Sequence, residues 1–115
     1  MSSFHLQNFS ADLSDEELKG FKMQTFELDL PPGESDTVSH KHDCDVFVVV
    51  LQGTAELRQD FGDSLHVLHA GQVFHENRNV THSLTRNPDP KIPLKLEIIF
   101  ITKSGRPTYT PLYKQ

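Results

Sequence analysis

The chain has 115 residues, with 11 lysines and arginines against 16 aspartates and glutamates, and a formal net charge of −5 at pH 7. This length fits one domain with one hydrophobic core, and the negative charge argues against nucleic acid as a partner. Cys44 is the only cysteine, which excludes a disulfide within the chain and a zinc site built from several thiolates. The composition therefore predicts a protein of a reducing compartment.

Residues 1–20 are expected to form an N-terminal arm with at most one short helix. The segment SDEELKG, residues 14–20, has Ser14 and Glu17 at the spacing of a capping box and Gly20 as a C-terminal stop. No basic head followed by an apolar stretch opens the sequence, and no apolar run approaches the roughly 20 residues of a spanning helix. We therefore expect a soluble cytoplasmic protein that does not bind membranes.

Residues 21–102 break into short runs rich in β-branched and aromatic residues, separated by Gly, Pro, Asn and Asp. The expected strands are 21–30, 36–42, 46–52, 54–59, 64–69, 72–76, 82–86 and 93–102. Two packed sheets closed into a jelly-roll barrel would hide the edges of these strands. The predicted fold class is therefore all-β, with the barrel at 21–102 and a C-terminal arm at 103–115.

Two histidines stand two positions apart in VSHKHDCDVFVVVLQG, residues 38–53. Side chains alternate between the faces of a strand, so His40 and His42 point the same way and can share one ion. A third ligand must come from elsewhere, and spacing alone does not choose it. The candidates are His5, His66, His69, His75, His82, Asp43, Asp45, Glu76 and Cys44.

The segment PPGESDTVSHKHDCDVFVVVLQGTAEL, residues 31–57, resembles the first motif of the cupin superfamily. That motif reads glycine, a gap, His-x-His, a glutamate, and a closing glycine. Gly33 opens it here, His40 and His42 supply the His-x-His, and Gly53 closes it. The resemblance implies a double-stranded β-helix barrel.

The segment LHAGQVFHENRNVTHSLTRN, residues 68–87, is similar to the second cupin motif. Gly71 opens it, His82 falls at its histidine, and Asn87 lies near its asparagine. The resemblance thus implies His82 as the third metal ligand. It also implies a homodimer that forms through barrel edges and N-terminal strands.

Two positions depart from the family pattern. The place of the family's glutamate ligand, separated by six residues from the closing Gly53, holds Val46, which cannot bind a metal. The Pro-x-Gly of the second motif is replaced by Asn77-Arg78-Asn79. Asparagine can adopt the left-handed backbone that glycine usually supplies, so we expect this turn to form.

The missing glutamate leaves three interpretations open. The site is a three-histidine site, as in the cupins that resemble the acetylacetone-cleaving and thiol dioxygenases; or Glu76 replaces the carboxylate or lies just behind the ligands; or the metal is lost and the pocket only binds a ligand. We favour the first, with Glu76 beside the metal as a catalytic polar residue. Further pocket candidates are Val46, Cys44 and Arg58.

Three neutral imidazoles leave a divalent ion with its full charge, so the site should attract an anionic chelating ligand. Imidazole suits Fe, Zn, Ni and Mn, and the sequence does not choose among them. By resemblance, the expected function is that of a non-haem metal dioxygenase acting on a small, oxygen-rich, chelating substrate. The alternatives are a non-catalytic metabolite-binding or sensor cupin and a metal-assisted isomerase or cyclase, because cupin folds host all of these.

The C-terminal arm ends in KSGRPTYTPLYKQ, residues 103–115, and is expected to be irregular. Its two tyrosines, Tyr109 and Tyr113, are predicted to pack on the barrel of the same chain or on that of a second subunit. Gln59 and Arg58 belong to a strand that often borders the pocket in cupins, and either is a possible anchor for a substrate anion.

Overall fold

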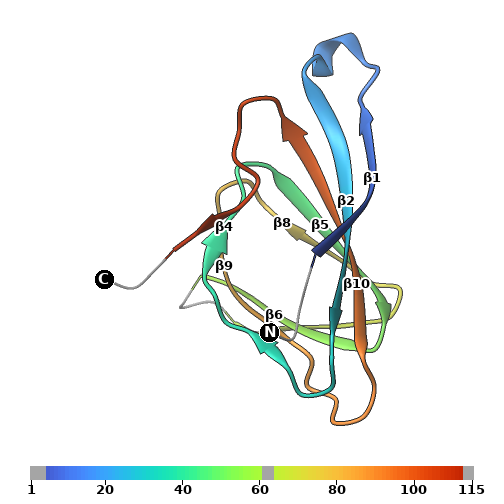
Figure 1. The fold of residues 1–115 in the computed structure, drawn as a ribbon. Helices are drawn as coiled ribbons and strands as arrows, with labels where there is room; N and C mark the ends of the chain where they lie inside the picture. Colours follow the sequence, from blue (N-terminus) through green and yellow to red (C-terminus); the bar gives the residue numbers. More distant parts are fainter. Residues whose placement is uncertain (1–4, 61–63, 113–115) are drawn as a thin grey trace.

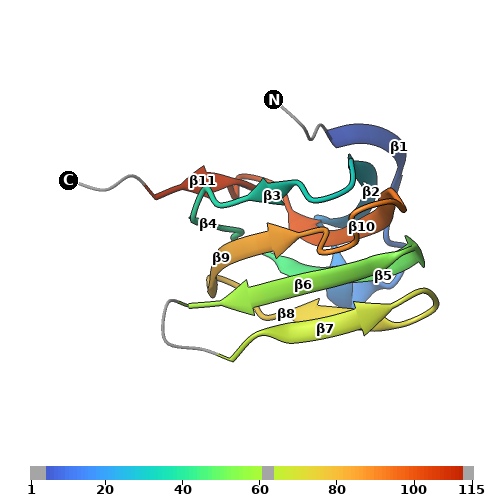
Figure 2. The same ribbon diagram turned by 90° about the horizontal axis from the view of Figure 1, so that it is seen from below.

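The computed structural model of the chain describes residues 5–60 and 64–112. Its strands are β1 (His5–Asp12), β2 (Phe21–Leu30), β3 (Ser35–Asp36), β4 (His40–Lys41), β5 (Asp45–Gln52), β6 (Thr54–Gln59), β7 (His66–His69), β8 (Val73–Glu76), β9 (Thr81–Arg86), β10 (Leu94–Lys103) and β11 (Thr110–Pro111). They form two antiparallel sheets, with the orders β1-β2-β10-β5-β8 and β11-β4-β9-β6-β7, and β3 pairs with β9. The two sheets enclose a barrel (Figure 1), and β6, β7 and β9 lie in front of β5 and β10 when it is seen from below (Figure 2). The predicted all-β class and double-stranded β-helix are confirmed.

The core lies between the sheets and follows from strict alternation in β5 and β10. The interior-facing positions of these two strands are buried, and they meet as cross-strand neighbours: Val50 with Leu96, Val48 with Ile98, and Val46 with Phe100. Burying one such aliphatic side chain stabilises the fold by about 1.5–3 kcal/mol. The even-numbered positions of both strands therefore fix which face of the sheet turns inward.

Two tight connections require a left-handed backbone. Gly53, between β5 and β6, has φ of 88°, and a Cβ there would lie 3.0 Å from the Pro93 carbonyl oxygen. Asn79 has φ of 65°, and its N–H donates to the His42 carbonyl at 2.8 Å. Asparagine tolerates this conformation better than most residues. The expectation that Asn79 would supply the turn in place of glycine is confirmed.

The N-terminal region contains a strand that the sequence analysis did not predict. β1 pairs with β2 along its whole length and is the outer strand of its sheet. The expected helix is a single 3₁₀ turn, Glu16–Leu18, and its cap is Asp15 rather than Ser14, because the Asp15 carboxylate accepts the Glu17 N–H at 3.0 Å. No helix within the described residues is long and apolar enough to cross a membrane.

The single strand expected at 36–42 is divided into β3 and β4. Asp36 ends β3, and its carboxylate accepts the N–H of Val38 at 3.1 Å. A short polar side chain that bonds the backbone two residues ahead favours a turn over a continuous strand. The chain then resumes as β4, so His40 lies in a strand while His42 lies just after it.

A buried asparagine joins the loops at one end of the barrel. Asn87 has no exposed surface, and its side-chain amide donates to the carbonyls of Leu30, Pro31 and Ile92 at 3.1, 3.3 and 2.9 Å. Its side-chain oxygen accepts the N–H of Asp89 at 3.0 Å. Asn87 therefore supports the backbone around the barrel, and these contacts leave it no role as a ligand.

Candidate functional site

Three histidines meet inside the barrel. β4 pairs with β9 so that His40 lies directly opposite His82, and His42 follows two residues later on the same face. All three side chains are buried. The ring centroid of His40 lies 4.8 Å from that of His42 and 5.1 Å from that of His82. The structure thus brings together the three histidines on which the sequence analysis focused.

Backbone carbonyls orient the rings of the histidine pair. Nδ1 of His40 lies 2.8 Å from the Val38 carbonyl oxygen, and Nδ1 of His42 lies 2.5 Å from that of Thr108. A carbonyl oxygen only accepts hydrogen bonds, so each Nδ1 must carry the proton and donate it. In the neutral rings the lone pair is then on Nε2. Histidine ligands of metals usually have this arrangement, in which the other ring nitrogen donates to a carbonyl or carboxylate.

His82 has different neighbours. Its Nε2 lies 2.5 Å from the Thr85 hydroxyl, and its Nδ1 forms an ion pair with Oε1 of Glu76. His82 is therefore held between the Thr85 hydroxyl and the Glu76 carboxylate. A carboxylate paired with one ring nitrogen fixes the orientation of a histidine, as it does for many metal-binding histidines.

Glu76 occupies the place across from the absent family glutamate. β5 pairs with β8 so that the Cα of Glu76 is the direct partner of Val46. Directly opposed residues of an antiparallel pair point to the same face, and both side chains are buried in the barrel. The carboxylate that the first cupin motif would place on β5 is therefore supplied by the neighbouring strand β8.

The site is charged in a defined way at neutral pH. Burial by itself would raise the pKa of Glu76, but contact with His82 and the nearby His42 and His40 outweighs this effect and lowers it. Burial lowers the pKa of His40, the hydrogen bond to the Val38 carbonyl opposes this effect, and the neighbouring His82 and His42 add to it, so that the pKa is about 4. Glu76 is therefore ionised and His40 neutral, which are the forms that bind cations.

This donor set fits a divalent transition metal. Two imidazoles bound to one ion at metal–nitrogen distances of about 2.0–2.1 Å place their ring centroids about 4.5–5 Å apart, close to the separations of His40 from His42 and from His82. The ionised Glu76 carboxylate, which is paired with His82, is a further donor. Among the described residues, however, no three His, Cys, Asp or Glu side chains already stand in positions that would hold an ion.

The remaining pocket candidates lie as follows. Val46 and Cys44 are both buried in the core, and burial raises the pKa of the Cys44 thiol to about 12, so it is not a thiolate at neutral pH. Arg58 lies on the face of β6 opposite to that of the buried Leu57, which turns it away from the barrel interior. Gln59 is instead the direct partner of His82, and a bulge at Ser83 of β9 separates this pair from the pair of Arg58 with Leu84.

The other candidate ligands lie elsewhere. His66 faces inward opposite Leu57 and its ring lies 5.0 Å from that of Phe74, whereas His69 is exposed on the other face of β7, as their spacing predicted. His75 pairs with Asp45 at 2.8 Å on the outer face of the sheet. Asp43 bonds Arg78 at 2.5 Å. The side chain of His5, and all of Tyr113, lie outside the described residues.

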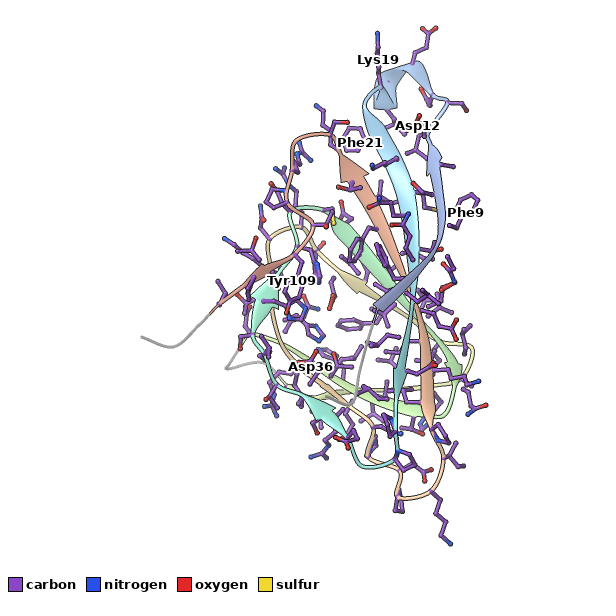
Figure 3. All side chains as sticks on the ribbon, viewed as in Figure 1. Phe9, Asp12, Lys19, Phe21, Asp36 and Tyr109 are labelled. Atoms are coloured by element: carbon purple, nitrogen blue, oxygen red, sulfur yellow. The ribbon has the colours of Figure 1, made fainter. Side chains whose placement is uncertain are left out.

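The C-terminal segment contributes residues that the sequence analysis did not place in the site. β11 pairs with β4, which brings Tyr109 against the histidines (Figure 3). Its ring centroid lies 4.7 Å from that of His40 and 6.0 Å from that of His42. Of the two alternatives expected for Tyr109, its own barrel or that of a second subunit, the structure shows the first. No periodicity or motif signals this contact, because it depends on a strand pairing with residues far away in sequence.

A larger hollow of about 790 Å³ lies away from this site, at the end of the β1–β2 hairpin. Its walls are residues 12–16, 19–21 and 104, and they include none of the histidines. Acidic side chains on an exposed hairpin are the ordinary solvated surface of a protein. We therefore assign the candidate site to the interior of the barrel.

Comparison with known proteins is consistent with this fold. The sequence profile of the family described as "Cupin domain" matches residues 26–102. No curated protein sequence matches the chain. Among solved structures, an uncharacterized conserved protein with a double-stranded β-helix domain from Klebsiella pneumoniae superposes with a TM-score of 0.70 at 17% identity, over 98% of this chain and 86% of that one.

Two further similar structures have names that indicate different roles. One is the DMSP lyase DddQ from Ruegeria pomeroyi, with a TM-score of 0.63 and 18% identity over 80% of this chain, which spans only 43% of the lyase. The other is the cupin domain of an XRE family transcriptional regulator from Enterobacter cloacae, with a TM-score of 0.65 and 20% identity over 89% of this chain and 98% of that domain. At these identities the likeness shows the fold alone. Since the family profile covers most of the chain, the protein belongs to the cupin superfamily.

Proposed function

We propose that the protein binds one divalent transition metal through His40, His42 and His82 and acts on a small chelating substrate. The observation that carries this proposal is the convergence of three buried imidazoles on an ionised, buried carboxylate. Imidazole nitrogens and carboxylate oxygens are the ligands by which proteins bind such ions. The carbonyls of Val38 and Thr108 hold the protons on Nδ1 of His40 and His42. The lone pairs of these two rings are therefore on Nε2, where they would coordinate a cation.

The reaction class that we propose is that of a non-haem metal dioxygenase. A bound ion would supply a Lewis acid and, if it is iron, the means to activate dioxygen. The protein's own contribution is to hold the substrate and manage its proton. Glu76 is ionised at neutral pH, so it can accept a proton or a hydrogen bond from a substrate hydroxyl group. Apolar walls formed by side chains such as Phe100 and Val46 keep water from the reacting groups.

The first test is metal content. Protein purified without an affinity tag should contain about one ion per chain of iron, zinc, nickel or manganese by elemental analysis. His40→Ala and His42→Ala should each remove most of this metal. His69→Ala is the matched control, because His69 is exposed on the outer face of β7. Metal content near zero in the wild type, or equal in all four proteins, contradicts the metal site.

The second test concerns the reaction. Protein loaded anaerobically with Fe(II) would be mixed with β-diketones, thiols and hydroxylated aromatics, and oxygen uptake would be recorded. Uptake with one class that disappears in Glu76→Gln, while the iron remains bound, supports a dioxygenase with Glu76 at the substrate. No uptake with any class removes the dioxygenase proposal.

A non-catalytic metabolite-binding or sensor role is the second candidate. Two observations favour it: His82 is engaged by Thr85 and Glu76, so no three described donor side chains already hold an ion position, and a similar fold occurs in a domain of a transcriptional regulator. This role predicts tight binding of a small ligand by the metal-free protein, without turnover. Calorimetry on chelator-treated protein separates it from the enzyme.

A further inference from the structure

A small apolar cavity adjoins the histidines. It has a volume of about 170 Å³ and is lined by Phe26, His42, Phe100, Thr108 and Tyr109. The rings of Phe26 and Phe100 lie 5.1 Å apart at 46°, and the ring of His42 lies 5.0 Å from that of Phe100. Aromatic rings prefer such tilted contacts with other rings. The cavity is thus an aromatic box with one polar wall, the His42 imidazole.

The outer wall of this box is Tyr109. Its side chain is 43% exposed on one side, while the other side stacks at 31° on the ring of His40. Figure 3 shows Tyr109 on the side of the barrel where β4 and the C-terminal segment run together. Tyr109 therefore forms the part of the cavity wall that also faces solvent.

The backbone on both sides of Tyr109 is held to the barrel. The Asp43 N–H donates to the Pro107 carbonyl at 3.2 Å, and the Leu112 N–H donates to the Ser39 carbonyl at 2.7 Å. Between these two bonds, the Thr108 carbonyl accepts the proton of His42 Nδ1. A wall fixed at both ends keeps a defined distance from Phe26 and Phe100, which gives the cavity a defined size.

We propose that this cavity binds the ring of a single-ring aromatic compound whose oxygen-bearing head group lies against the histidine cluster, and that Tyr109 sets the upper limit on ring size. An engineered apolar cavity of about 150 Å³ binds benzene, so about 170 Å³ accommodates one six-membered ring and excludes a second fused ring. The contact between the head group and the histidine cluster rests on the proposed metal function, whereas the limit that Tyr109 sets on ring size is independent of it.

The probes are chosen to separate the ring from the head group. Salicylate and 3-hydroxy-2-naphthoate have the same ortho-hydroxycarboxylate head but one and two fused rings, and phenol and 2-naphthol have the same rings without a chelating carboxylate. In metal-free protein an anionic head would meet the ionised Glu76, so phenol and 2-naphthol test the cavity alone. In zinc-loaded protein the two hydroxycarboxylates test the cavity together with the head-group contact.

The experiment measures affinity by calorimetry and by saturation-transfer NMR for the wild type, Tyr109→Ala and Tyr109→Phe. Wild type and Tyr109→Phe should bind salicylate at least about tenfold more tightly than 3-hydroxy-2-naphthoate. Tyr109→Ala opens the wall, so this preference should fall to about threefold or less. Phe9→Ala is the matched control, because Phe9 is an exposed aromatic residue on the outer strand β1 and does not line the cavity. Circular dichroism shows that each variant is folded.

The outcomes distinguish the two proposals. If zinc does not bind but metal-free wild type binds phenol more tightly than 2-naphthol, and Tyr109→Ala removes this preference, the metal function fails and the size-limited cavity stands. If zinc binds but wild type takes both hydroxycarboxylates equally well, or Tyr109→Ala leaves their ratio unchanged, the cavity proposal is overturned while the metal site stands.

Discussion

Mild acid should destabilise the metal-free protein through His40. This side chain is 8% exposed, and burial lowers its pKa to about 4 from the model-peptide value of 6.5. The folded state therefore keeps His40 neutral down to about pH 4, whereas in the unfolded chain the same imidazole takes up a proton below about pH 6.5. Between these values the unfolded state binds more protons, so stability falls as the pH falls.

The size of the effect follows from linkage. With a folded pKa of about 4 and an unfolded pKa of 6.5, the free energy of unfolding should drop by about 2 kcal/mol between pH 7.5 and pH 5. Solvent that reaches the edge of the ring reduces this to about 1 kcal/mol. Either value is a large fraction of the stability of a small domain, which is about 5–15 kcal/mol.

The assay is urea denaturation of chelator-treated protein at intervals from pH 7.5 to pH 5, for the wild type, His40→Gln and His69→Gln. Glutamine at position 40 cannot titrate, so the stability of His40→Gln should depend on pH less steeply than that of the wild type. His69→Gln should follow the wild type, because His69 is exposed. Parallel curves for the wild type and His40→Gln would refute the reasoning.

Two asparagines and one exposed phenylalanine give three further tests. Asn87→Asp places a carboxylate oxygen where the amide now donates to three carbonyls, so it should lower the free energy of unfolding at pH 7 by about 3 kcal/mol or more. Asn87→Ala, which only removes the hydrogen bonds, should lower it less. Equal losses would exclude repulsion between the new carboxylate and the three carbonyl oxygens. Asn79 has φ of 65°, so thermal denaturation should find Asn79→Ala about 1 kcal/mol less stable than Asn79→Gly, and the reverse order would be incompatible with a strained turn. The homodimer expected from the cupin resemblance remains a prediction. Phe9 points away from the barrel on β1 and is 49% exposed (Figure 3), so Phe9→Asp should convert a dimer to a monomer in light scattering. A monomeric wild type would contradict the expected homodimer.

The local pattern of the sequence was sufficient to predict much of the barrel. The expected strands 21–30 and 54–59 match β2 and β6 residue for residue. Strand parity placed His40 and His42 on one face and His66 and His69 on opposite faces. These predictions hold because side-chain direction along a strand depends only on neighbouring residues.

What the sequence did not predict depends on how strands pair. The sequence does not signal the bulge in β9, where Ser83 is the extra residue between the partners of Arg58 and Gln59, so that His82 and Thr85 are both buried although they are three positions apart. One-residue shifts of this kind reverse the facing that parity predicts. The strand β1 and the division of 36–42 also escaped prediction, the latter because the Asp36 carboxylate competes for the backbone.

The sequence by itself determined the all-β barrel and the histidine pair, since alternation and turn residues are local properties of the chain. Only the tertiary structure decided that Glu76 on β8 stands opposite Val46, where the family pattern has its glutamate, and that Tyr109 reaches the histidines by the pairing of β11 with β4. Contacts between distant strands are fixed by register and closure of the barrel, and neither is encoded in the spacing of residues along one strand.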